Sequence, residues 1–264
     1  RQDNLICIMC PMIILVIFIG FILGMIINLL ADSLPRYREV RGFHCISCGA
    51  KRKPLIWSGL ISLLVGKRKC SYCGNLQEWR GPLVEIAMAV GGYLIYQSDP
   101  TVSVMFPRFI VLFIFVLIAV IDIEHRLILH IVSGPSAVVI FILSFIDPDV
   151  DSLNILVGGV VGFFSFLLLY FLGQLFAMVM GKLRGTQIDE VAFGFGDVTL
   201  AGVIGLTLGW QEYKVVAALI AGILLAGVFS FLYIIVRMFR KTYTPFMPIP
   251  YGPFLIVGCL LVYF

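Results

Sequence analysis

Residues 13–30 read IILVIFIGFILGMIINLL, an apolar run that only two glycines and one asparagine interrupt. A helix of about 20 apolar residues, at ~1.5 Å per residue, crosses the ~30 Å hydrocarbon core of a bilayer. The run is therefore expected to span a membrane, and the polar sequence DSLPR at residues 32–36 should end it. No small-residue cleavage site of the signal-peptide type follows the run.

The composition of the whole chain agrees with this interpretation. Of its 264 residues, 61% are hydrophobic and 13% are charged, and the mean hydropathy is +1.06. Soluble domains are about 45–50% apolar and about 25% charged, so a soluble barrel or a two-domain dehydrogenase is excluded. Further apolar runs lie at residues 82–96, 108–121, 127–146, 155–180, 191–208, 215–236 and 249–264. We expect an all-α polytopic membrane protein with about eight transmembrane helices.

The basic residues predict the orientation of these helices. With eight spans, a cytoplasmic segment 32–80 places the short segments after residues 121, 180 and 236 on the same side. These segments together hold 16 of the 19 Lys and Arg residues. Such an uneven distribution is what the positive-inside rule expects, so both termini should face away from the cytoplasm.

Four cysteines in segment 32–80 form two Cys-x-x-Cys pairs, Cys45 with Cys48 and Cys70 with Cys73. The pairs are 21 residues apart, and a glycine follows each of them. This pattern suits a tetrahedral, structural Zn²⁺, because four thiolates leave no open coordination position for catalysis. Two disulfides are the alternative, which a reducing cytosol disfavours. A segment this short would need a cross-link of one of these kinds to fold.

Acidic residues within apolar helices are costly and therefore point to function. Asp122 ends one apolar run, Asp197 begins another, and Glu85 lies near the start of a third. In the predicted topology the two aspartates lie at cytoplasmic helix ends, where they can meet and share one proton, as an acid and base for peptide hydrolysis require. Gly194 and Gly196 precede Asp197 and would leave space for an extended substrate backbone.

Other interpretations of these residues stay open at this point. Each aspartate alone could be a helix cap or a partner of the helix dipole, and Glu85 could equally be a first-turn acid of that kind. A transporter would use Asp122 and Asp197 as ion or proton carriers at the midplane. A zinc-ribbon membrane scaffold would need only the cysteines. The basic residues of segment 32–80 suit contact with anionic lipid, and no motif among them indicates nucleic-acid binding.

The chain resembles the type IV prepilin peptidases, also called leader peptidase/N-methyltransferases, which are membrane aspartic proteases of the Gly-x-Gly-Asp class. The similarity extends over nearly the whole chain. It rests on Gly20-x-x-x-Gly24-x-x-x-Asn28, the two cysteine pairs, Arg80-Gly81-Pro82-Leu83-Val84-Glu85, Ile121-Asp122, Gly194-Phe195-Gly196-Asp197-Val198, Leu208-Gly209-Trp210 and Pro250-Tyr251-Gly252-Pro253-Phe254-Leu255.

The resemblance implies cleavage of the short basic leader from prepilins or pseudopilins at the cytoplasmic face of a bacterial inner membrane. Asp122 and Asp197 match the catalytic aspartates of the family. Many members also methylate the new N-terminus with S-adenosylmethionine, an activity associated with the cysteine segment and with the glutamate that corresponds to Glu85. Family members commonly have a proline a few residues after the first aspartate and a lysine two residues after the second, where this chain has no proline and Thr199.

The resulting division of the chain has three parts. Residues 1–31 form the first transmembrane helix, residues 32–80 the cytoplasmic zinc-binding segment, and residues 81–264 a transmembrane peptidase domain of about seven helices. Glu85 is expected to contact the basic leader or the new amine of the substrate.

Overall fold

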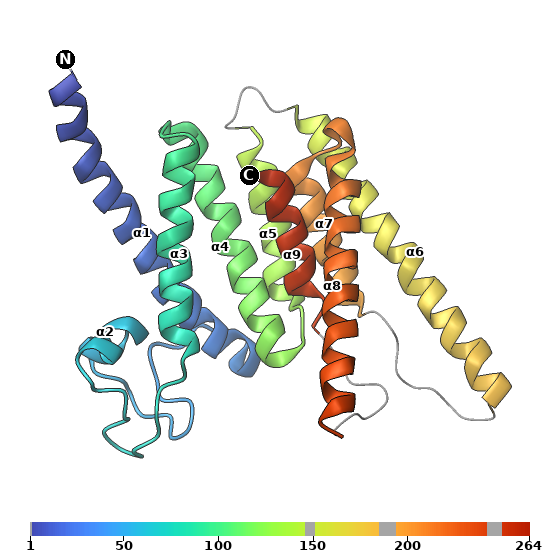
Figure 1. Cartoon of the computed structure of the whole chain (residues 1–264), viewed down its shortest axis with the longest axis horizontal. Coiled ribbons are helices and arrows are strands. Elements are labelled where there is room, and N and C mark those ends of the chain that lie inside the picture. The colour runs from blue at the N-terminus through green and yellow to red at the C-terminus, as the bar shows by residue number, and fades with distance from the viewer. Residues whose placement is uncertain (1, 146–150, 185–193, 242–249) are drawn as a thin grey trace. The chain divides into compact units, whose positions relative to one another are not determined.

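The computed structural model describes residues 2–145, 151–184, 194–241 and 250–264. Regular structure in these ranges is helical, apart from two isolated β-bridges beside the cysteines (Figure 1). The α-helices are α1 (Gln2–Tyr37), α2 (Gly59–Leu64), α3 (Arg80–Ser98), α4 (Val102–His125), α5 (His130–Leu143), α6 (Ser152–Arg184), α7 (Phe195–Leu208), α8 (Lys214–Phe239) and α9 (Gly252–Tyr263), and the 3₁₀ turns are η1 (Pro54–Ile56) and η2 (Gln211–Tyr213).

Each of the eight apolar runs forms a helix in the described ranges, which confirms the all-α prediction. Four helices are long and apolar enough to cross a bilayer: α1, α4, α6 and α8. The apolar helices α5, α7 and α9 have only 12 to 14 residues, and α3 is not among the candidate spans, so the expected eight spans are not confirmed. At 1.5 Å per residue the short helices reach about 20 Å, less than a hydrocarbon core. The expected helix starts at residues 191 and 249 and the expected end at 146 lie outside the described residues.

The first helix does not end at the polar sequence that follows its apolar run. Helix α1 continues through Asp32 to Tyr37, so the helix extends beyond the end of the apolar run at Leu30. Asp32 forms an ion pair with Arg80 at the start of α3, and the Ser33 hydroxyl donates to the carbonyl of Arg41 at 3.0 Å. Because both polar side chains have partners, the helix can extend beyond its apolar part.

The chain folds as two compact units, residues 1–117 and 118–264. In the first unit, α1 packs along α3 through two glycines (Figure 1). A Cβ on Gly20 would lie 2.5 Å from the Met88 carbonyl oxygen, and a Cβ on Gly24 would lie 2.7 Å from the Glu85 Cα. These two positions let the helix backbones touch, as small residues do between membrane helices.

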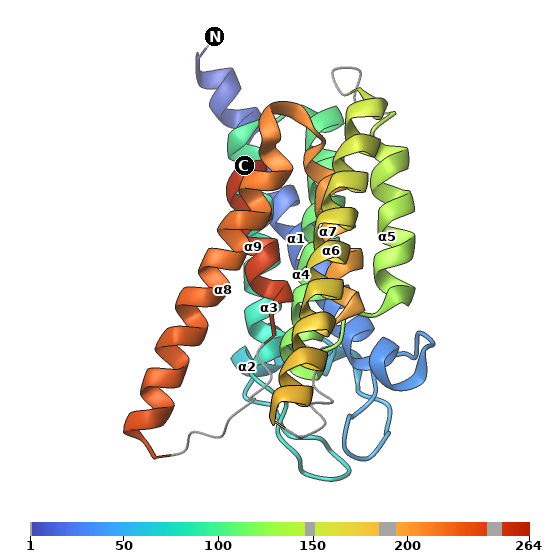
Figure 2. The ribbon, with the colours of Figure 1, turned by 90° about the vertical axis from the view of Figure 1, so that its right-hand side faces the viewer.

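The second unit contains the end of α4 and helices α5 to α9. Helices α6 and α7 approach each other at Gly158 and Gly205, where an added Cβ on either glycine would lie 2.1 to 2.5 Å from the carbonyl oxygen of the other. Helices α8 and α9 lie side by side in Figures 1 and 2, and Gly222 and Gly258 form their contact. Two closely packed helix pairs, α6 with α7 and α8 with α9, thus build much of this unit.

Candidate active site and metal centre

Asp122 lies in the last turn of α4, where its side chain is buried. Its Oδ2 accepts a hydrogen bond of 3.0 Å from the backbone N–H of Gly252, the first residue of α9. A Cβ on Gly252 would lie 2.6 Å from that same oxygen, so a residue without a side chain is required there. One of the free amides at the start of α9 therefore holds the Asp122 carboxylate.

Asp197 lies in the first turn of α7 and is partly buried. Its Oδ2 accepts a hydrogen bond of 3.1 Å from the backbone N–H of Gly194, the N-cap residue. This is one half of a capping box, in which the third helical residue bonds back to the cap. Asp197 is thus a helix cap, and its second oxygen, Oδ1, has no hydrogen bond from any described residue.

The structure brings the two aspartates together within the second unit. Their carboxyl groups are close enough for an electrostatic interaction, although 75 positions separate them in the sequence. Among the described residues, the only hydrogen bond to each carboxylate comes from a backbone N–H. Each carboxylate is therefore positioned through one oxygen, and its other oxygen accepts no hydrogen bond from the described residues.

The two glycines before Asp197 differ in what surrounds them. A Cβ on Gly196 would lie 2.7 Å from the Cβ of Ile128, in the turn between α4 and α5. A Cβ on Gly194 would meet only ordinary contacts, the nearest at 3.7 Å from Asp197 Oδ2, and this residue is exposed. Packing inside the protein explains Gly196, whereas a Cβ at Gly194 would meet no described atom closer than 3.7 Å.

Phe195 connects the Gly-Phe-Gly-Asp turn to its neighbours, a role that sequence reasoning missed. Its ring makes edge contacts with His130 of α5 and with Phe163 and Tyr170 of α6, at centroid distances of 5.7, 6.4 and 6.0 Å. The sequence could not indicate this cluster, because aromatic residues are common throughout an apolar chain. The cluster fixes the turn that carries Asp197.

Thr199 occupies the position at which the family commonly has lysine. Its hydroxyl donates to the carbonyl of Gly196 at 2.8 Å and accepts from the Ser133 hydroxyl of α5 at 3.3 Å. The connection after α4, which contains no proline, is short: Arg126 has a left-handed φ of 53°, and α5 begins at His130. At this position a neutral side chain therefore makes one hydrogen bond within α7 and one to α5, where the family commonly has a charged lysine.

The four cysteines converge at one point of the first unit. All four Sγ atoms lie within 4.8 Å of one another, with Cys45 and Cys73 at 3.6 Å and Cys48 and Cys70 at 3.8 Å. Four sulfurs around Zn²⁺ at about 2.3 Å would be about 3.8 Å apart in a tetrahedron. The donor set therefore fits a tetrahedral zinc ion, as the spacing predicts.

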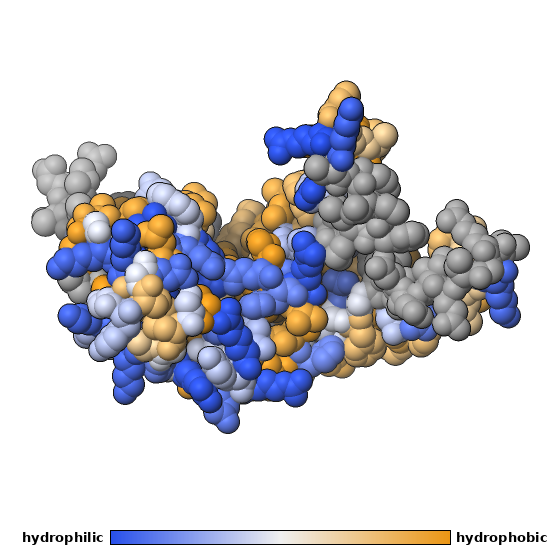
Figure 3. Space-filling model, turned by 90° about the horizontal axis from the view of Figure 1, so that it is seen from below, coloured by the Kyte–Doolittle hydropathy of each residue, from blue (hydrophilic) through white to orange (hydrophobic). Residues whose placement is uncertain are grey.

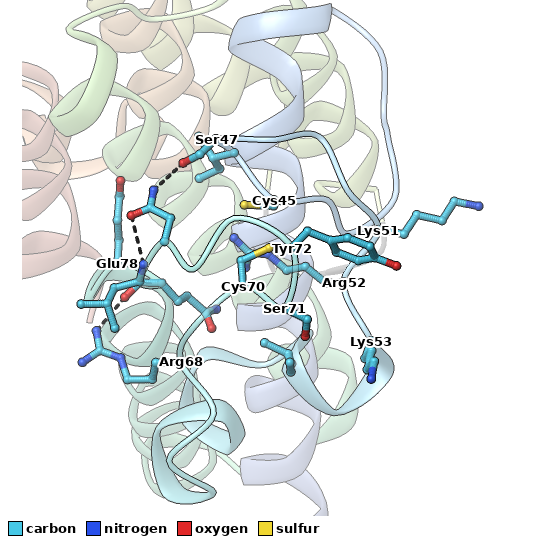
Figure 4. A pocket seen from close by; sticks show the side chains of 15 residues that line it. Cys45, Ser47, Lys51, Arg52, Lys53, Arg68, Cys70, Ser71, Tyr72 and Glu78 are labelled. Carbon is cyan, nitrogen blue, oxygen red and sulfur yellow. Dashed lines mark hydrogen bonds between the residues drawn. The ribbon is translucent and has the colours of Figure 1, made fainter.

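The two cysteine turns repeat the same backbone geometry. Gly49 and Gly74 have φ values of 70° and 72°, and each donates its N–H to the carbonyl of the first cysteine of its pair, at 2.9 and 3.0 Å. The backbone amides of Cys73 and Tyr72 lower the pKa of the Cys70 thiol to about 6. This favours the thiolate form that a metal ion binds. Basic side chains, among them Lys51 and Arg68, surround the turns (Figure 4).

Glu85 is fully buried in the first unit, between α3 and the start of α2. Its carboxylate accepts hydrogen bonds from the Ser58 hydroxyl at 2.6 Å, the Gly59 N–H at 2.8 Å, the Leu60 N–H at 2.9 Å and the Asn28 amide at 3.4 Å. Glu85 therefore caps a helix other than its own. The prediction that it contacts substrate stays untested, and such contact would require these bonds to open.

The fold and the sites define a class: a helical membrane protein that carries two aspartates at helix ends of one compact unit and a cluster of four cysteines able to hold a metal ion. The chain belongs to the type IV leader peptidase family. Its residues 109–235 match the type IV leader peptidase family itself, and residues 18–98 match the bacterial peptidase A24 N-terminal domain.

Several curated relatives described as prepilin leader peptidase/N-methyltransferase are similar to the chain. The Pseudomonas aeruginosa protein is 24% identical over 92% of this chain and 86% of its own length. The Klebsiella pneumoniae protein is 26% identical over 73% of this chain and 83% of its own length. The Bacillus subtilis protein is 24% identical over 95% and 92%. No solved structure matches the chain significantly.

Proposed function

We propose that this chain is an aspartic endopeptidase that removes the short basic leader from type IV prepilins or pseudopilins. The observation that carries this proposal is the pair of carboxyl groups, Asp122 and Asp197, each held by one backbone N–H and electrostatically coupled to the other. Membership of the leader peptidase family and the names of the relatives support the same reaction.

In this reaction the two aspartates share one proton, because two like charges at one site cannot both ionise easily. The ionised carboxylate takes a proton from a water molecule, which attacks the scissile peptide carbonyl. The protonated carboxyl donates its proton to the carbonyl oxygen, and a proton then passes to the leaving amine as the C–N bond breaks. Gly194 leaves room for the substrate backbone beside Asp197, while Gly196 keeps the turn packed on Ile128.

Cleavage takes place at the cytoplasmic face of a bacterial inner membrane in this proposal. The 16 basic residues assigned to one side by the eight-span topology support that orientation. The positions of the aspartates disfavour the transporter alternative, since Asp122 is in the last turn of α4 and Asp197 in the first turn of α7. A carrier would place them near the middle of long spans.

The four cysteines are proposed to hold a structural Zn²⁺ that stabilises the segment 32–80. With four thiolate ligands the ion offers no open position, so it supplies folding energy and no chemistry. Within this proposal residues 1–31 form the first membrane helix and residues 81–264 the peptidase part. Purified protein should contain close to one zinc ion per chain, and a ratio far below one would reject the site.

Methylation of the new N-terminus with S-adenosylmethionine is proposed from the names of the relatives. That cofactor is cationic at its sulfonium and amino groups, and two acidic residues in or next to the cysteine segment are already engaged by other groups of the protein. Asp32 is paired with Arg80, and Glu85 is occupied by four hydrogen bonds. A gain of one methyl group in the mass of cleaved pilin would support this activity, and its absence would remove it.

Cleavage by purified variants in detergent tests the aspartate pair. Asp122→Asn and Asp197→Asn should each reduce the rate of prepilin cleavage by at least about 10²-fold, the contribution typical of a positioned acid or base. Glu124→Gln, two residues beyond Asp122, is the matched control and should keep nearly the parent rate. Unchanged helix content and zinc content show that each variant is folded. Parent-like cleavage by either folded asparagine variant would refute the pair.

A further inference from the structure

The short helix α2 and the turn that follows it have no role in the proposed chemistry. Helix α2 ends in two exposed apolar side chains, Leu64 with 77% and Val65 with 46% of its surface exposed. Gly66 then reverses the chain with a left-handed φ of 69°, and Lys67, Arg68 and Lys69 follow directly. We name residues 64–69 the α2 tip.

Contacts with α1 and α3 place the start of α2 close to the end of an apolar membrane helix. A Cβ on Gly59 would lie 2.6 Å from the backbone nitrogen of Pro82 in the first turn of α3. The neighbouring Gly81 carbonyl accepts a hydrogen bond of 3.0 Å from the Asn28 amide of α1. Asn28 is the third residue from the end of the apolar run 13–30, within the candidate span Pro11–Tyr37. The start of α2 therefore lies beside the end of the apolar run of α1.

The basic side chains of the α2 tip border a concave surface. Its volume is about 560 Å³, and its lining combines cationic groups with two apolar side chains: Lys53, Lys67, Arg68, Lys69, Ile56 and Leu76. The Arg68 guanidinium lies 4.1 Å above the ring of Trp79, which is 60% exposed, and donates to the Gln77 carbonyl at 2.7 Å. In Figure 3, hydrophilic side chains gather over the cysteine segment with apolar ones between them.

The charge of this surface selects among possible occupants. Residues 32–80 contain ten Lys and Arg residues but only three acidic residues. A basic prepilin leader would be repelled by such a surface, whereas anionic headgroups would be attracted to it. Apolar side chains at the end of a short helix, followed by lysines and flanked by an exposed tryptophan, are typical of segments that lie in a membrane interface.

We propose that the α2 tip is a docking surface for the anionic lipids of the membrane in which the chain is embedded. Leu64 and Val65 insert among the acyl chains at the boundary, and Lys67 and Lys69 contact the phosphate groups. This contact holds the cysteine segment against the bilayer surface, in addition to its attachment through α1 and α3. The inference concerns lipid binding and does not depend on the proposed peptidase activity.

Hydrogen exchange of the full chain in lipid nanodiscs tests this surface. We compare nanodiscs of phosphatidylcholine with nanodiscs that also contain phosphatidylglycerol. Backbone amides of the α2 tip should exchange about fivefold or more slowly with the anionic lipid, the factor that a single basic residue at an anionic surface provides. High salt should remove the difference, because it screens exposed charges.

Two sets of variants separate lipid contact from a change in folding. Lys67→Gln/Lys69→Gln should lose the lipid dependence, whereas the charge-matched control Arg38→Gln/Lys51→Gln should keep it. Leu64→Ser should speed exchange of the tip in both lipids, since the apolar contact does not depend on headgroup charge. Equal exchange of the parent in both lipids, or equal behaviour of the two double variants, would overturn the proposal. The salt series uses the parent protein alone and stays decisive if a variant does not fold.

Discussion

Replacement of Glu85 with alanine separates two roles for this residue, a structural cap and a substrate contact. The carboxylate accepts hydrogen bonds from Gly59 N–H at 2.8 Å, Leu60 N–H at 2.9 Å and the Ser58 hydroxyl at 2.6 Å. Alanine leaves these buried donors without an acceptor. Glu85→Ala therefore tests whether one side chain of α3 is responsible for the position of α2.

The size of the effect follows from the two backbone amides. A buried donor that loses its partner costs about 1–3 kcal/mol, and the Ser58 hydroxyl can turn toward another group while the amides cannot. We expect Glu85→Ala to lower the local unfolding free energy of α2 by about 3–5 kcal/mol. Glu85→Gln keeps one acceptor oxygen and should cost about 1–2 kcal/mol.

Hydrogen exchange measured by mass spectrometry reports this change directly. A loss of about 3–5 kcal/mol corresponds to amide exchange in α2 that is about 10²- to 5 × 10³-fold faster, since each ~1.4 kcal/mol is a factor of ten. The control Glu78→Ala removes an exposed carboxylate of the same segment and should leave the exchange unchanged. If α2 exchanges at the parent rate in Glu85→Ala while cleavage or methylation falls, the capping role is wrong and Glu85 contacts the substrate.

Three further predictions concern the aspartates and the metal site. Gly252→Ala places a Cβ 2.6 Å from Asp122 Oδ2 and should slow prepilin cleavage by about 10²-fold, the cost of misplacing a reacting group by about 1 Å. The control Gly227→Ala adds a Cβ with no neighbour within 4 Å and should cleave at the parent rate. Equal rates for the two variants would contradict the contact between Asp122 and the Gly252 amide. Gly196→Ala should speed hydrogen exchange in the turn before α7, because its Cβ meets Ile128. Gly194→Ala should fold normally and raise KM for the prepilin. Faster exchange in Gly194→Ala together with a raised KM in a normally folded Gly196→Ala would reject the roles assigned to the two glycines. Cys70→Ser should lose most of the bound zinc measured by elemental analysis, whereas the control Ser71→Ala should keep it. Acid should weaken zinc binding in the parent protein, because protons compete with the metal for the thiolates. A full zinc content in Cys70→Ser would exclude the four-cysteine site.

The sequence predicts those parts of the fold that depend on local composition. Long apolar runs become helices because a membrane chain must satisfy its backbone groups internally, and each run does form one. Helix α2 was missed, since six residues are too few to show a helical period. The true end of α1 was missed because the partner of Asp32 is Arg80, 48 positions away.

The residues of the candidate sites could be predicted from the sequence, but the groups that hold them in place could not. Spacing alone predicts the cysteine cluster, and the rarity of acids in apolar sequence identifies Asp122 and Asp197. Their supports could not be predicted, because the Gly252 amide is 130 positions from Asp122 and reaches it only through the packing of α9. For Glu85, the sequence suggested the dipole of its own helix, whereas the structure pairs it with the start of α2.

The close packing of glycines in the second unit has a mechanical consequence for the aspartates. Asp197 is carried by α7, whose backbone packs directly against that of α6 at Gly158 and Gly205. The amide that holds Asp122 is carried by α9, which is joined to α8 in the same way. The gap between the two carboxyl groups is therefore set where the two pairs meet. A small slide of one pair along the other would change the separation of the two carboxyl groups without separating either pair.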